Sequence, residues 1–172
     1  EAVNPFGLAR QYVQSRNGRR RTAFFFPHDT ETGGWWQGEN ARLASLATAA
    51  RLAVPLFDDD PAFQASLRNY ATDQLNWILG LNPYDVSMLT GAGRNNPEYR
   101  FFTSWQYKSA PGGICNGITG GLNDDEGIDF QVPYEQTGVD SDWRWGEQWL
   151  PHGAWYLLAA ASGKTAAAPK EK

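Results

Sequence analysis

Residues 60–80 read DPAFQASLRNYATDQLNWILG, and this stretch decides the fold class. Asp60 supplies an N-cap and Pro61 fits a first helical turn, since its missing N–H would be unsatisfied there anyway. Apolar and large side chains then recur at helical spacing until Gly80, at Phe63, Leu67, Tyr70, Ala71, Gln74 and Ile78. The pattern predicts a helix over about residues 60–80.

Two further segments carry the same periodicity. The stripe in the first is Leu43, Leu46, Ala47, Ala50 and Val54, which predicts a helix over about 38–54 that Pro55 closes. Pro151 opens the second, which continues to Ser162 before Gly163 can terminate it, so we expect a helix over about 150–162. A weaker helix is expected over 6–14.

The region 81–149 differs from these helices, because it holds many glycines and aromatic residues but no sustained period. Long irregular connections in compact domains are usually functional. We therefore expect an ordered excursion with short strands or turns, laid across one end of a helical scaffold. The sequence predicts no extended sheet, no internal repeat and no domain boundary.

Composition limits the function classes. The chain has 172 residues, enough for one domain or a large piece of one, and contains 8 Trp. That number fits either a large core or a sugar site, where indole faces stack on pyranose rings. A net charge of −4 argues against nucleic acid. The single cysteine, Cys115, excludes an internal disulfide and a multi-cysteine zinc site but leaves the compartment open.

The sequence predicts no membrane span and no cofactor. No stretch approaches the roughly 20 apolar residues that a bilayer requires, and these 172 residues show no charged start followed by an apolar signal core. The first residue, Glu1, suggests a processed product, a fragment or a trimmed chain. Residues 164–172 are expected to form a flexible tail.

A first candidate site precedes the helix at 38–54, in the run FPHDTETGGWWQGEN over residues 26–40. Trp35 and Trp36 are adjacent and cannot share one helix face, so at least one is expected to offer an aromatic floor to a sugar, unless both pack in the core. Glu39 is a candidate sugar contact, although a carboxylate in a first helical turn also stabilises the helix dipole. His28 has no second histidine at metal-ligand spacing, which favours a structural role and predicts no metal site.

A second candidate site, the run DSDWRWGEQW over residues 140–149, precedes the helix at 150–162. Glu147 is enclosed in sequence by Trp143, Trp145 and Trp149. Burial among these rings would raise its pKa, as a general acid near neutral pH requires. The alternative is a surface glutamate, or one paired with Arg144.

Other motifs carry weaker signals. The acidic run 123–129 lacks the alternation of an EF-hand loop, and the glycine pairs at 112–113 and 120–121 do not open a helix after a strand. The basic cluster at 19–21 is expected in a solvated polar turn. Cys115 has no histidine nearby in sequence, which argues against a nucleophilic role for its thiol.

The order of these features resembles the C-terminal part of glycoside hydrolase family 9. The resemblance covers about residues 35–162: a helix ends in Ile78-Leu79-Gly80-Leu81-Asn82-Pro83, a Ser and a glycine-rich stretch follow, and Gly146-Glu147 precedes the last helix. The run WWQGENARL from Trp35 is similar to that of members described as endoglucanase-related or as exo-glucosaminidases.

The resemblance implies an all-α fold, a partial (α/α)6 barrel of the six-hairpin glycosidase type with long ordered loops. Residues 1–163 would be the C-terminal portion of one catalytic domain. It also implies inverting hydrolysis of β-1,4-linked glucose or glucosamine oligosaccharides or polysaccharides. Glu147 would be the catalytic acid, and the N-terminal half of the domain would supply an aspartate base that this chain lacks. Arg100 would contact substrate, together with Trp35, Trp36, Glu39, Trp143 and Trp145.

Three departures from typical cellulases of the family bear on the substrate. A His-His-Arg run is replaced by Tyr99-Arg100-Phe101, so only Arg100 carries over. Gly146 replaces an Asn before the acid, and Pro151 replaces an Asp four residues after it. Glucosamine or a modified glucose therefore competes with plain cellulose.

Two other function classes remain open. A non-catalytic carbohydrate-binding module would also be acidic and rich in Trp, but such modules are mostly β-sandwiches, against which the helical stripes argue. If the chain were a helical interaction domain without catalysis, the clusters of Trp and acidic residues at the helix entrances would have no function.

Overall fold

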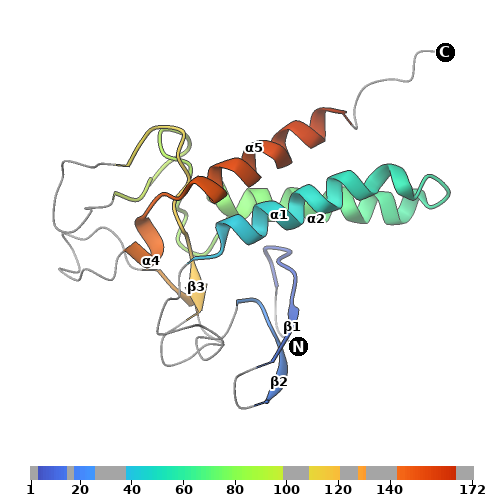
Figure 1. The fold of residues 1–172 in the computed structure, drawn as a ribbon, viewed down its shortest axis with the longest axis horizontal. Coiled ribbons are helices and arrows are strands. Elements are labelled where there is room, and N and C mark those ends of the chain that lie inside the picture. Colours follow the sequence, from blue (N-terminus) through green and yellow to red (C-terminus); the bar gives the residue numbers. More distant parts are fainter. Residues whose placement is uncertain are drawn as a thin grey trace.

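Three long helices form the main layer of the chain in the computed structural model (Figure 1). The structure describes residues 4–14, 18–25, 38–98, 109–120, 128–130 and 143–165. Helix α1 spans Asn40–Ala53, α2 spans Pro61–Ile78 and α5 spans Leu150–Thr165. A 3-10 turn, η2, spans Val54–Leu56, and the single-turn helix α4 spans Trp143–Gly146. Helix α1 packs against both α2 and α5.

All three predicted long helices are confirmed, with small shifts at their ends. Asp60 caps α2 by accepting a 2.9 Å hydrogen bond from the Phe63 amide, and Pro61 is the first helical residue. Pro55 does not end the helical turn at once, because η2 continues α1 through it. Gly163 does not terminate α5, which runs on to Thr165.

The predicted helix over 6–14 is wrong, because part of it forms a hairpin. Strand β1, Gln11–Gln14, pairs antiparallel with β2, Arg20–Ala23. Gly7 has a φ of +64°, which interrupts a helix before the strand begins. The basic cluster is also corrected, since Arg20 and Arg21 belong to β2 and do not lie in a turn.

A second small sheet and two isolated bridges order the region after α2. Strand β3, Thr119–Gly120, pairs antiparallel with β4, Ile128–Asp129. Bridges link Leu89 to Ile114 and Cys115 to Gln148. Figure 1 shows these segments and α4 gathered at one end of the three helices. The described part of 81–149 therefore confirms an excursion with short strands at one end of the scaffold, and adds these strands to the predicted all-α fold.

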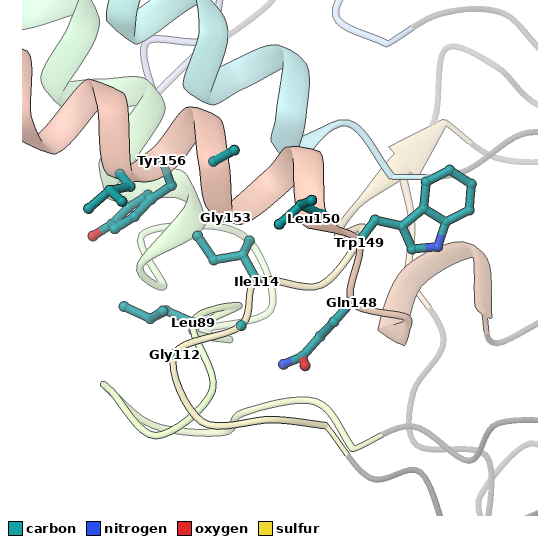
Figure 2. A pocket seen from close by; sticks show the side chains of 11 residues that line it. Leu89, Gly112, Ile114, Gln148, Trp149, Leu150, Gly153 and Tyr156 are labelled. Atoms are coloured by element: carbon teal, nitrogen blue, oxygen red, sulfur yellow. The ribbon is translucent and has the colours of Figure 1, made fainter.

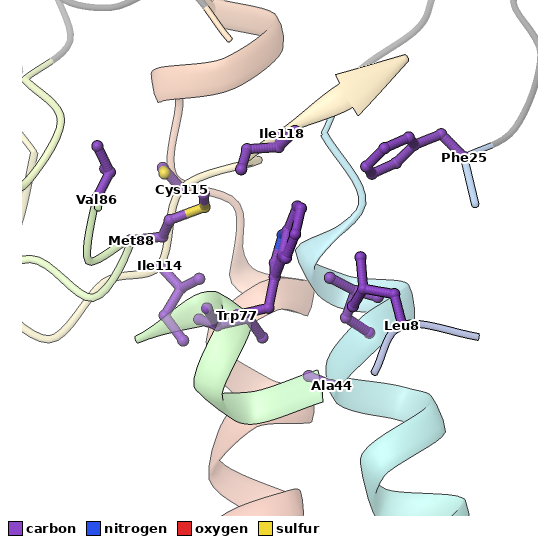
Figure 3. Close-up of a cluster of buried hydrophobic side chains, with 11 residues drawn as sticks. Leu8, Phe25, Ala44, Trp77, Val86, Met88, Ile114, Cys115 and Ile118 are labelled. Atoms are coloured by element: carbon purple, nitrogen blue, oxygen red, sulfur yellow. The ribbon is translucent and has the colours of Figure 1, made fainter. Parts of the chain in front are cut away.

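The main core lies where the helices meet this irregular region (Figure 3). Trp77, at the end of α2, is 2% exposed and stands between the hairpin and the loops. Phe6 meets its ring edge-on at 5.3 Å, and Phe25 lies 6.2 Å away. On the other side are Val86, Met88 and Cys115. This tryptophan serves the core and not a sugar site.

A smaller core joins the helices through alanines. Its buried members are Ala47, Ala50, Ala71, Leu75 and Ala159, which come from all three long helices. Small side chains allow helix backbones to approach closely, so this layer is held by tight helix packing. In the described ranges, no helix is long and apolar enough to cross a membrane.

The hydrogen bonds of the Asn82 side chain explain why an Asn-Pro pair follows the end of α2. The Asn82 side chain donates to the carbonyls of Trp77 and Val86 at 2.8 and 2.9 Å, and accepts from the amides of Tyr84 and Val86. A single buried amide thus satisfies the helix end and fixes the chain direction beyond it.

Candidate active site

The segment 114–119 is the centre of the candidate site, because its backbone joins separate parts of the chain. The Asn116 amide donates to the Glu147 carbonyl at 2.8 Å, and the Gly117 amide donates to the Trp145 carbonyl at 2.8 Å. On the other side, the Asn116 carbonyl accepts from the Asn40 amide at 3.1 Å. This one segment therefore fixes the chain before α5 relative to the start of α1.

Two glycines make this close approach possible. Gly117 has a φ of +92°, and a Cβ there would lie 2.4 Å from the side-chain nitrogen of Asn40, Nδ2. A Cβ on Gly38 would lie 2.1 Å from the Gly117 carbonyl oxygen. The Gly38 amide also donates to the Arg144 carbonyl at 2.7 Å. The described ends of the two predicted constellations, 26–40 and 140–149, are therefore in direct contact.

Glu147 lies in the short connection between α4 and α5. Its side chain is half-buried, and the Trp149 indole N–H donates to one carboxylate oxygen, Oε2. The other oxygen accepts no hydrogen bond from the described residues. The indole thus orients the carboxyl group, while Oε1 remains available to a reacting atom.

The tryptophans predicted around Glu147 have different environments. Trp145 is 2% exposed, which favours a packing role. Trp143 is half-buried, and the Arg144 guanidinium stacks 4.5 Å from its ring centre. In this described part of the chain, Arg144 contacts the indole and does not neutralise Glu147. The predicted alternative of a Glu147–Arg144 pair is therefore not observed.

Glu39 is the N-cap residue of α1 and not a member of its first turn. Its side chain makes no capping hydrogen bond, so capping does not explain it. Instead, the carboxylate pairs with Arg42 and is 9% exposed. Arg42 also donates to the Phe24 carbonyl at 2.9 Å, which ties the end of the hairpin to α1. The Glu39 carboxylate thus has a structural partner.

Several predicted residues fall outside the described residues. They are His28, Trp35, Trp36 and Arg100, together with the acidic run 123–127. Their sugar-binding or solvated roles stay predictions.

The sequence did not reveal two buried polar residues beside Glu147. Asn116 is 0% exposed and His152 is 2% exposed, and their side chains meet at 2.6 Å. Burial lowers the pKa of His152 to about 4, so it is neutral near pH 7. A signal did exist: an Asn that follows the apolar pair Ile114-Cys115, and a His in the first turn of an apolar helix, are each unusual at core positions.

A groove of about 720 Å³ opens beside this site (Figure 2). Trp149 stands at one end and Tyr156 at the other. Its floor includes Leu89 and Ile114. Gln148 borders it and is held in place by Thr90 at 2.8 Å and by the Ala110 amide at 2.7 Å. The groove is lined mainly by apolar atoms, and no pattern in the sequence predicted a groove at this position.

Metal or thiol chemistry finds no support in the described ranges. There, no group of three or more His, Cys, Asp or Glu side chains could hold a metal ion. Burial raises the pKa of the Cys115 thiol to about 12, so it is not a thiolate near neutral pH.

Comparison with known proteins identifies the family. The family model for glycosyl hydrolase family 9 matches residues 8–150. The chain belongs to glycosyl hydrolase family 9. This match includes Asn40, Asn116 and Glu147, while His152 lies just beyond its end.

A solved structure supports the fold of this family 9 chain. It is similar to that of endoglucanase CelQ from Clostridium thermocellum complexed with cellobiose and cellotriose, with a TM-score of 0.55 and 18% sequence identity. The likeness covers 79% of this chain and 23% of that chain. The family 9 chain therefore shares its fold with less than a quarter of that enzyme. No curated protein matches it.

Proposed function

We propose that the chain supplies the general acid, Glu147, for inverting hydrolysis of β-1,4-linked glucose or glucosamine oligosaccharides and polysaccharides. In this proposal residues 1–163 are the C-terminal portion of one catalytic domain with an (α/α)6 barrel, and 164–172 are a tail. The match to glycosyl hydrolase family 9 supports it. The N-terminal half of the domain would then be the partner that contributes the base.

The orientation of Glu147 is the observation that carries the proposal. Its Oε2 accepts from the Trp149 indole, and its backbone is fixed by Asn116. A carboxyl group held in this way presents Oε1 to a bound substrate with little freedom to rotate. Preorganised donors of this kind reduce the cost of reaching the transition state.

The reaction divides between two carboxyl groups. Glu147, protonated on Oε1, would give its proton to the glycosidic oxygen as the bond from that oxygen to the anomeric carbon breaks. A carboxylate from the N-terminal half would take a proton from water, whose oxygen bonds to the anomeric carbon from the opposite face. The sugar product has inverted configuration, Glu147 is left ionised, and the base is left protonated.

Sugar binding would use aromatic and charged groups at the helix entrances. We propose that Trp35, Trp36 and Trp143 provide stacking faces and that Arg100 and Glu39 contact hydroxyl or amino groups. Trp145 would support this site by packing beneath it, in accord with its burial. The Glu39–Arg42 pair implies that a sugar contact at Glu39 would have to share the carboxylate with Arg42.

Glu147→Gln in the complete catalytic domain tests the proposal. This change keeps the shape of the side chain but removes the donated proton. We expect kcat on cellotetraose, or on the glucosamine tetrasaccharide if that is the better substrate, to fall roughly 10²- to 10⁴-fold. The matched control is Asp60→Asn, the same acid-to-amide change at the exposed start of α2, which should leave kcat unchanged. Near wild-type turnover by Glu147→Gln would reject the proposal and make Glu39 the next carboxylate to test.

A further inference from the structure

Asn116 has four polar groups, and each has a partner at the candidate site. Its amide N–H donates to the Glu147 carbonyl and its carbonyl accepts from the Asn40 amide. Its side-chain Nδ2 donates to the Trp143 carbonyl at 2.6 Å. Its Oδ1 lies 2.6 Å from His152 Nε2. The residue is completely buried, so water does not compete for these bonds.

These bonds hold both ends of the turn that leads to Glu147. Trp143 begins α4, and Glu147 follows its last residue. Asn116 binds the carbonyl of the first with its side chain and the carbonyl of the second with its backbone. Helix α4 has a single turn and little stability of its own. This double anchor fixes the two ends of α4, while the Gly117 and Gly38 amides bind the carbonyls between them, so the orientation of Glu147 depends on Asn116 together with these backbone bonds.

His152 completes the arrangement from the first turn of α5. Because Asn116 Nδ2 is already donating to Trp143, Oδ1 must accept, so Nε2 of His152 carries the proton. The histidine fixes which way the Asn116 amide faces. Its other ring nitrogen, Nδ1, is buried and has no hydrogen-bond partner among the described residues. The burial that keeps the ring neutral is consistent with this role of a fixed donor.

We infer that Asn116, oriented by His152, is a positioning residue for the general acid at Glu147. The two residues do not touch substrate. They set the direction from which the Glu147 proton reaches the glycosidic oxygen, by clamping α4 against the segment 114–119. This inference rests on the proposed function of Glu147.

Substrates with different leaving groups separate positioning from mere stability. An unactivated tetrasaccharide needs a correctly aimed proton, whereas a dinitrophenyl glycoside of the same sugar has a leaving group that departs without one. We expect Asn116→Ala in the complete catalytic domain to lower kcat on the tetrasaccharide roughly 10- to 100-fold, with KM little changed. The loss on the dinitrophenyl glycoside should be several-fold smaller.

Asn82→Ala is the matched control, because Asn82 is also a buried amide that binds two backbone carbonyls, just after the C-terminal end of α2, but it has no bond to α4 or to Glu147 among the described residues. It should lower thermal stability and change both substrates equally. Should Asn116→Ala fail to fold, His152→Phe removes the donor to Oδ1 and should give the same selective loss. His152→Gln retains an N–H donor and should restore most of the tetrasaccharide rate.

The reference variant Glu147→Gln distinguishes the two ways of failing. If it shows the leaving-group-selective loss while the variants at Asn116 and His152 lose activity equally on both substrates, the positioning role is overturned and the general acid stands. If Glu147→Gln shows no selectivity, the proposed function fails and the positioning role fails with it. Additional selectivity from Asn116→Ala in the Glu147→Gln background would also contradict the inference, since no donated proton remains to be aimed.

Discussion

The helical layer and the loop end of this chain are held together by different means. The three long helices meet through small apolar residues such as Ala47, Ala71 and Ala159, all completely buried. The loop end, made of the described parts of 81–149 with the start of α1, relies on buried amides and glycines. The buried Asn82 and Asn116 and the half-buried Asn96 each bind several backbone groups there.

The difference shows why the candidate chemistry lies at the loop end. Many different combinations of apolar side chains can pack the same helices together. Helix packing therefore fixes the scaffold but does not position individual polar atoms. A network of buried hydrogen bonds fixes each of its members in one position, because an unmade bond in the interior is costly. Glu147 belongs to the second kind of structure. Three substitutions test this contrast.

The largest effect on stability is expected from Gly117→Ala. This position has a φ of +92°, and a Cβ would lie 2.4 Å from the Asn40 side chain, itself buried and bonded to the Cys115 carbonyl. We expect a loss of about 4 kcal/mol in the free energy of unfolding, from backbone strain and overpacking together. Urea unfolding followed by circular dichroism measures it.

Gly112→Ala is the matched control for that change. Its φ is +81°, but a Cβ there meets nothing within 4 Å. It should lose only the strain of a left-handed conformation, about 1–2 kcal/mol. Equal losses at the two positions would show that the close approach of 38–40 to 116–117 does not stabilise the loop end.

Acid should destabilise the loop end through His152. Its pKa is about 4 in the folded chain against an ordinary value of 6.5, so the unfolded chain gains this proton first as the pH falls. The free energy of unfolding should therefore decrease between about pH 6.5 and pH 4, by at most about 3 kcal/mol. His152→Gln should remove this part of the pH dependence. An unchanged slope in that variant would mean that His152 is not buried as a neutral ring.

A smaller effect is expected in the helical layer from Asp60→Ala. The Asp60 carboxylate accepts from the Phe63 amide at the exposed start of α2. Its loss should cost about 1 kcal/mol of stability without changing kcat, because the cap lies away from the loop end. Asp58→Ala, at a nearby exposed position, should be close to neutral. A fall in kcat for Asp60→Ala would show that the two regions are coupled.

The sequence predicted the helical layer well because its rules are local. Periodicity, the Asp60-Pro61 cap and the first-turn Pro151 depend on residues a few positions apart. The hairpin at Gln11 was missed although its partners lie close in sequence, because its two strands are only four residues long and mostly polar, which gives no clear period-two pattern. Glu147 could be selected from its aromatic neighbours and from the family resemblance. Only the structure distinguishes it from Glu39, because Glu39 pairs with Arg42 whereas Glu147 accepts a hydrogen bond from the Trp149 indole. Asn116 and His152 lie 36 positions apart in sequence, and nothing local predicts their contact.

The leaving-group dependence of kcat for Glu147→Gln decides whether Glu147 is the general acid. A series of aryl β-glycosides with leaving groups of increasing pKa would be hydrolysed by the complete catalytic domain and by this variant. The wild-type rate should depend weakly on leaving-group pKa, because Glu147 protonates the departing oxygen, whereas the rate of Glu147→Gln should fall steeply as that pKa rises. Equal slopes for the two enzymes would contradict the assignment of Glu147 as the general acid.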